Sequence, residues 1–159
     1  MISTVLSGGA VAVVGSTVLG QVVSGTLNGI YSTLSYLKNG SIVPEYIEHV
    51  NSHLRKLDLE MKIAVSNEIL SKENKTTTEN IVEHGMTELL HQIENVLQNI
   101  HKQLDDHQHK WFASYRTLPI AKELAQLDEL TTILDKRLDI IIKLAAAHSN
   151  SNSNSSIIM

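Results

Sequence analysis

The chain contains no cysteine. Disulfide bonds, thiol nucleophiles and metal sites built on cysteine are therefore excluded, and redox chemistry says nothing about the compartment. Acidic side chains outnumber basic ones by 17 to 13, and the net charge of −4 provides no basic field to hold the phosphates of a nucleic acid. We therefore expect no nucleic-acid partner.

Charged side chains are missing from the first part of the chain. Every Asp, Glu, Lys and Arg lies between Lys38 and Lys143, and six of the eight glycines lie within residues 8–29. A secretory signal begins with positive charge, so we expect no cleaved signal here. Composition divides the chain into three parts: an uncharged, small-residue-rich helix over residues 1–37, an amphipathic bundle over residues 38–147, and a Ser/Asn tail over residues 148–159, which we expect to be disordered.

The middle part has helical periodicity. Spacings of three and four residues predict a first helix from about Pro44 to Lys72, with one apolar stripe made of Ile47, Val50, Leu54, Leu57, Met61 and Ala64. Proline suits the first turn of a helix, where its missing N–H has no partner to lose. The pairs Asp58/Lys62 and Asp139/Lys143, an acid followed four residues later by a base, are typical of solvated helix faces.

Two further helices are predicted. The second runs from about Thr77 to Arg116, after a Thr76-x-x-Glu79 capping box, and the third runs from Pro119 to Ala147. The apolar seam of the second helix is Val82, Met86, Leu89, Ile93, Val96, Ile100, Leu104, His107 and Trp111. The seam of the third is Ile120, Leu124, Leu127, Thr131, Leu134, Leu138, Ile141 and Ala145. Short connections make neighbouring helices antiparallel, so the sequence predicts an all-α antiparallel three-helix bundle.

The uncharged first segment adds a further helix, for which three environments are open. Val5 to Val23 contains nine Val or Leu residues, which favours insertion into a membrane, whereas its Ser, Thr and Gln residues oppose it. A core position in a four-helix bundle is the second environment, because a glycine-rich helix in water needs packing on most sides. A self-associating surface is the third. We favour the membrane.

Small residues recur along one face of this segment. Gly8, Ala12, Ser16, Gly20 and Ser24 are spaced by four, and Gly25 with Gly29 forms a GxxxG pair, a pattern along which membrane helices pack closely. Tyr31, Tyr36 and Lys38 follow where interface anchors are expected.

Metal sites and catalysis are not indicated. Glu88 and His91 form a single Glu-x-x-His pair, whereas a dimetal bundle needs two such pairs and two more inward carboxylates. His101, Asp105 and His109 share one helix face, which is more typical of a solvated face than of a zinc site. No motif pairs a nucleophile with a base, so we expect no enzymatic activity, no catalytic residues, no cofactor and no small-molecule substrate.

The densest cluster of aromatic and basic residues is HQHKWFASYR, residues 107–116. As a candidate partner-binding surface it offers His107, Lys110, Trp111, Phe112, Tyr115 and Arg116. The alternative is that Trp111 and Tyr115 close the hydrophobic core at the end of the second helix. We favour this structural role.

Together with LDELTTILDKRLDIIIKL, residues 127–144, this cluster resembles small uncharacterised helical proteins of large nucleocytoplasmic DNA viruses. The resemblance covers about residues 44–146 and does not include the apolar segment. It implies a viral origin and a place in the virion or the infected host cell, and it implies no catalytic residues.

The sequence thus predicts a non-enzymatic, membrane-associated structural or scaffolding protein. Its first helix would anchor it, and the bundle would bind a protein partner or a second copy of the chain. The alternatives are a soluble four-helix interaction module with residues 7–29 as its core helix, and a membrane-permeabilising helical bundle.

Overall fold

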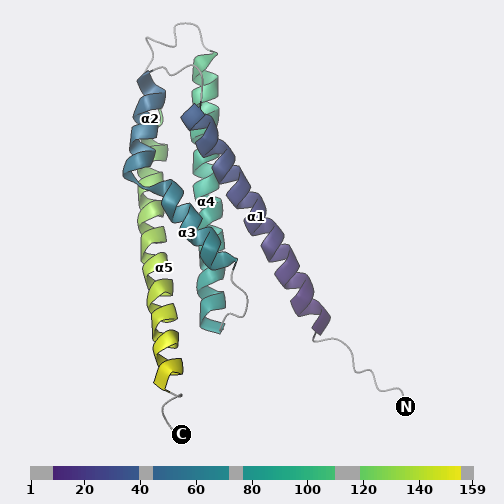
Figure 1. The fold of residues 1–159 in the computed structure, drawn as a ribbon. Helices are drawn as coiled ribbons and strands as arrows, with labels where there is room; N and C mark the ends of the chain where they lie inside the picture. Colours follow the sequence, from purple (N-terminus) through teal and green to yellow (C-terminus); the bar gives the residue numbers. More distant parts are fainter. Residues whose placement is uncertain (1–8, 40–44, 72–76, 110–118, 155–159) are drawn as a thin grey trace, which may run out of the picture.

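The computed structural model describes residues 9–39, 45–71, 77–109 and 119–154, and these form five helices with no strand among them. The helices are α1 (Gly9–Asn39), α2 (Glu45–Lys56), α3 (Leu59–Leu70), α4 (Thr77–Gln108) and α5 (Ala121–Asn154). Figure 1 shows α4 and α5 side by side along their length, with α2 and α3 against them and α1 crossing α4. The all-α class and a helical bundle are thereby confirmed.

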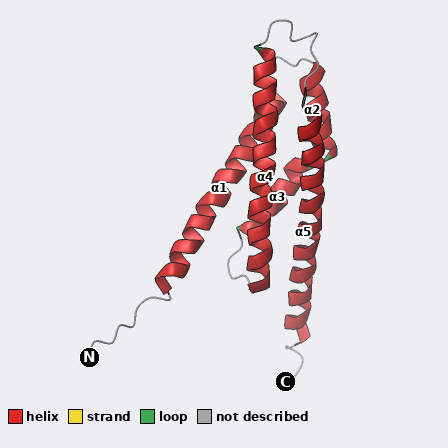
Figure 2. Cartoon of the chain, turned by 180° about the vertical axis from the view of Figure 1, so that it is seen from behind, coloured by secondary structure: helices red, strands yellow, loops and turns green. Residues whose placement is uncertain are grey.

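Contacts between helices give their directions. Gln103 of α4 bonds to Glu123 of α5, and Arg137 of α5 bonds to the Gly85 carbonyl of α4. Both bonds are possible only if the two helices run antiparallel. The helix α1 runs in the same direction as α4, because Gly29 meets Glu94 and Tyr36 meets His101. The segment of α2 and α3 runs in the same direction as α5, because His53 meets Asp128 and Lys62 meets Asp135. Toward Gly9, α1 diverges from α4 and α5 in both views (Figures 1 and 2).

The core is built from the predicted seams of α4 and α5. Side chains less than a tenth exposed include Met86, Leu89, Ile93, Val96, Ile100, Leu104 and His107 on α4, Ile120 directly before α5, and Leu124, Leu127, Thr131, Leu134, Leu138 and Ile141 on α5. The hydroxyl of Thr131 donates to the Leu127 carbonyl at 2.7 Å, so this polar side chain is satisfied inside the core. Ala145, predicted as the end of the α5 seam, is exposed.

The predicted first helix is wrong in one respect, because it is two helices. The chain turns at Leu57 and Asp58, and Asp58 adopts a left-handed conformation with φ 51°. Asp visits this region more readily than most residues with a Cβ atom. Met61 and Ala64, predicted on the apolar stripe, are exposed, and Leu59 and Ile63 are buried in their place.

Two helix ends also differ from prediction. Helix α4 ends at Gln108 rather than at Arg116. The Asp105 carbonyl in its last turn accepts from the backbone N–H of His109 at 3.3 Å and lies 2.8 Å from the ring Nδ1 of the same residue. Helix α5 continues to Asn154, so the tail expected to be disordered is helical over residues 148–154. The Thr76 end of the capping box lies outside the described residues.

Candidate functional site

The C-terminal half of α1 is where the uncharged segment meets the bundle. Its apolar face contributes Leu27, Ile30, Leu34 and Leu37 to the core, and all four are less than a tenth exposed. A spacing of three and four residues produces this face, as in any helix that covers a core. Residues 27–37 of α1 therefore belong to the fold of the bundle.

Contacts of four α1 residues hold this half in place, and we call Gly29, Tyr36, Leu37 and Lys38, with their partners, the α1 interface. At Gly29, the side chain of Glu94 lies so close that a Cβ atom would overlap its carboxylate. The absence of a side chain lets α1 approach α4 there. Glu94 is itself only 12% exposed, and its carboxylate accepts from Gln98 at 3.1 Å and lies 3.4 Å from the ring of His91.

Two more contacts continue the α1 interface toward the end of the helix. The ring centroids of Tyr36 and His101 lie 3.9 Å apart with an interplanar angle of 32°. The side-chain amide of Asn51 on α2 donates to the Leu37 carbonyl at 2.6 Å. This carbonyl is among the last four of α1, which have no partner within the helix, so α2 supplies the missing donor.

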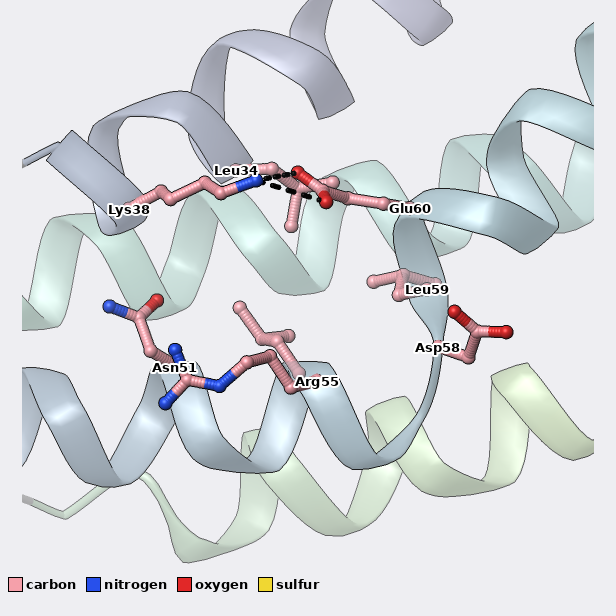
Figure 3. A pocket seen from close by; sticks show the side chains of 8 residues that line it. Leu34, Lys38, Asn51, Arg55, Asp58, Leu59 and Glu60 are labelled. Carbon is pink, nitrogen blue, oxygen red and sulfur yellow. Dashed lines mark hydrogen bonds and ion pairs between the residues drawn. The ribbon is translucent and has the colours of Figure 1, made fainter.

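The fourth contact borders a small cavity. Lys38 reaches across to Glu60 of α3, with its Nζ 3.2 Å from each carboxylate oxygen (Figure 3). The cavity has a volume of about 220 Å³ and is lined by Leu34, Lys38, Asn51, Leu54, Arg55, Asp58, Leu59 and Glu60. Arg55 is paired with Glu48, so the basic groups that line the cavity are both engaged with carboxylates.

A hydrogen bond fastens α2 to α5, and an ion pair fastens α3 to α5. His53 Nε2 lies 2.7 Å from Asp128 Oδ1, and Lys62 Nζ lies 2.8 Å from Asp135 Oδ2. The two aspartates are seven residues apart, so they lie on one face of α5 two turns from each other. A His–Asp pair also orients the base in hydrolases, but no hydroxyl group of the described residues is bonded to His53.

The residues predicted from the sequence to form a packing face and interface anchors have different environments in the structure. On the predicted packing face, Ser24 and Gly25 are exposed, nothing lies within 4 Å of a Cβ atom at Gly25, and Gly29 packs on α4. Ala12, Ser16 and Gly20 lie within α1, and Gly8 lies outside the described residues. Of the three predicted interface anchors, Tyr31 is 39% exposed, whereas Tyr36 and Lys38 contact the bundle.

The predicted partner-binding cluster is described only at its start. His107 is buried near the end of α4, and Lys110, Trp111, Phe112, Tyr115 and Arg116 lie outside the described residues. Sequence reasoning missed Asn51, His53, Glu94 and Asp128. The spacing of seven between Asp128 and Asp135 was the one available signal, and it does not name the partners.

Of the residues weighed as metal ligands, His101 lies against Tyr36, and His109 Nδ1 lies 3.7 Å from Asp105 Oδ1. Glu88 is exposed, and His91 faces Glu94. Over the described part of the chain, no three His, Asp or Glu side chains are grouped so as to hold a metal ion.

The described residues contain no helix that is both long enough and apolar enough to cross a bilayer. No family model matches the chain. No curated protein and no solved structure matches it either. The resemblance to helical proteins of large DNA viruses therefore stays a prediction.

Proposed function

We propose that the protein is a non-enzymatic, membrane-associated scaffolding protein in which α1 has two roles. The half of α1 from Leu27 to Leu37 is a structural part of the bundle. The preceding half, residues 9–22, carries the attachment to a membrane surface, and the bundle presents its charged faces to a protein partner or a second copy of the chain. In the virus that the resemblance implies, the protein would act in the virion or the infected cell.

One observation carries this proposal, namely the divergence of α1 from the bundle. Toward Gly9 the helix leaves α4 and α5 (Figure 1), and it does so where its sequence has no charged residue. The sequence of residues 9–22 is uncharged and rich in valine, which favours an apolar environment such as a membrane.

The burial of Leu27, Ile30, Leu34 and Leu37 favours a second candidate, the soluble four-helix interaction module. In that function the whole of α1 would be a bundle helix and no lipid would be bound. The two candidates differ in what residues 9–22 contact. They agree that the C-terminal half of α1 is needed for folding.

Vesicle flotation with matched charge variants tests the proposal. Lysine at two positions four residues apart is introduced either in the uncharged half, as Val14→Lys with Val18→Lys, or at exposed sites of the bundle half, as Asn28→Lys with Ser32→Lys. Phosphatidylcholine vesicles are used because they have no net charge to attract lysine. A lysine on an apolar helix face opposes attachment, because its ammonium group would lose hydration on entering the apolar part of the bilayer.

We expect the full chain and the Asn28/Ser32 variant to float with the vesicles, and the Val14/Val18 variant to lose at least tenfold in the bound fraction. A full chain that remains folded and does not float would overturn membrane attachment and favour the interaction module.

A further inference from the structure

The segment from Glu45 to Leu70 contains two apolar registers. In sequence, Met61 and Ala64 continue the stripe of Ile47, Val50 and Leu54, because each step of three or four residues returns to nearly the same face of a helix. In the structure, Met61 is 59% exposed and the burial passes to Leu59, Ile63 and Ser66. The chain can thus bury either set, one as a continuous helix and the other as the broken pair α2 and α3.

One residue separates the two arrangements. Asp58 is the only residue other than glycine with a positive φ in the described part of the chain, and Leu59 begins the next helix directly after it. A permanent break would be best served by glycine, which adopts the left-handed region at no steric cost. Asp is compatible with both the left-handed conformation and a helix interior.

Lys62 has a partner in either arrangement. In the broken form its ammonium lies 2.8 Å from Asp135 of α5. In a continuous helix it would instead face Asp58, four residues earlier, in the orientation that stabilises helices. The exchange of one carboxylate for another keeps the lysine paired, so electrostatics opposes neither form strongly.

The ion pair between α3 and α1 is exposed, whereas Leu59, Ile63 and Ser66 of α3 are buried in the core. Lys38 and Glu60 are 66% and 58% exposed, and exposed ion pairs contribute little to stability. Leu34 and Leu59 line the cavity of about 220 Å³ beneath the turn, so packing between α1 and α3 leaves space there (Figure 3). The attachment of α2 is separate, through Asn51 to Leu37 and His53 to Asp128.

We propose that α2 and α3 form a conformational latch with two states. In the closed state, which is the structure described above, the chain bends at Asp58 between α2 and α3, and α3 lies against α1. In the open state, residues 45–70 form one continuous helix, Lys62 turns to Asp58, and α3 leaves Lys38 and Leu34. Opening would free α1 to bind a membrane. This consequence rests on the proposed function.

Distance measurements between two spin labels test the latch. The chain has no cysteine, so His49→Cys and Asn67→Cys introduce the only two labelling sites, and both positions are exposed. The 18 positions between them are five turns of a continuous helix, which places the labels on one face about 27 Å apart. The bend at Asp58 gives a shorter distance, resolved from the longer one by pulsed electron paramagnetic resonance.

Asp58→Gly and Asp58→Ala shift the latch in opposite directions. Glycine accepts the bend, whereas the Cβ atom of alanine disfavours it and alanine favours the helix. We expect the ratio of the long to the short distance to be about tenfold higher for alanine than for glycine. A single short distance in both variants would overturn the latch, and so would a single long distance in both.

A second pair of variants serves if Asp58→Ala does not fold. Asp135→Asn removes the closed-state partner of Lys62 and leaves Asp58 in place. We therefore expect the ratio of molecules with the long distance to molecules with the short distance to increase up to about fivefold. The matched control is Asp139→Asn, which lies one turn further along α5 and is paired with Lys143 at 2.6 Å. Equal distance distributions in these two variants and the unmodified chain would overturn the latch.

Flotation with the same phosphatidylcholine vesicles separates the latch from the proposed function. Greater vesicle binding by Asp58→Ala than by Asp58→Gly supports the link to α1. A change in distance with unchanged vesicle binding keeps the latch and overturns the link. The Val14/Val18 lysine variant tests membrane attachment independently of both.

Discussion

Gly29 of α1 lies against Glu94 of α4, and the carboxylate occupies the space that a Cβ atom at position 29 would need. Gly25, one turn earlier on the same helix, has nothing within 4 Å of the equivalent point. The two glycines of the GxxxG pair therefore have different environments. Only Gly29 is required for contact with the bundle.

Alanine substitutions should distinguish these two positions. Gly25→Ala should raise the free energy of unfolding by up to about 1 kcal/mol, because alanine favours the helix. The free energy of unfolding of Gly29→Ala should be lower than that of Gly25→Ala by at least about 1 kcal/mol, because Glu94 must move away from His91 and Gln98. Urea denaturation measures both. If the Gly29→Ala deficit persists unchanged in a Glu94→Ala background, the contact with Glu94 is not its cause.

Truncation of Ile30 should show that α1 is part of the core. This side chain is fully buried, so Ile30→Ala should lower the free energy of unfolding by about 2–5 kcal/mol. Its neighbour Tyr31 is 39% exposed, and Tyr31→Ala is the matched control, with an expected change well below that of Ile30→Ala. Similar small effects of both variants in urea denaturation would mean that this half of α1 does not pack on the bundle.

The bond from Asn51 to the Leu37 carbonyl should tie α2 to the end of α1. Asn51→Ala should cost about 1 kcal/mol through the lost donor, and Asn51→Asp should cost more, because a carboxylate placed near a carbonyl oxygen cannot donate. Thermal unfolding at neutral pH compares them, with the exposed Asn67→Ala as a control. An Asn51→Asp variant as stable as the unmodified chain would contradict the assigned donor.

Periodicity predicted the long helices well because one register persists through each of them. The seams of α4 and α5 from Met86 to His107 and from Ile120 to Ile141 are buried as the spacing indicates. Periodicity failed at Asp58, where the sequence supports two registers and only tertiary contacts, such as the burial of Leu59 and Ile63 in the core, select one. A pattern within one helix contains no information about those partners.

The contacts of α1 were predicted less completely for the same reason. Composition predicts one uncharged helix over residues 1–37, because composition does not reveal where a helix leaves its bundle. Leu27, Ile30, Leu34 and Leu37 do have the spacing of a core face. The partner residues Glu94, His101 and Asn51 lie on other helices and have no signal in the sequence of α1.

The division of α1 into a bundle half and a membrane half is tested most directly by urea unfolding of a chain that lacks residues 1–22, beside the full chain. The shortened chain keeps Leu27 and every residue of the α1 interface, so we expect the same midpoint and the same dependence on urea. A chain that lacks residues 1–37 loses Leu27 through Leu37 and should unfold at much lower urea or not fold at all. Loss of cooperative unfolding on removal of residues 1–22 alone would contradict the account, because those residues would then be part of the core.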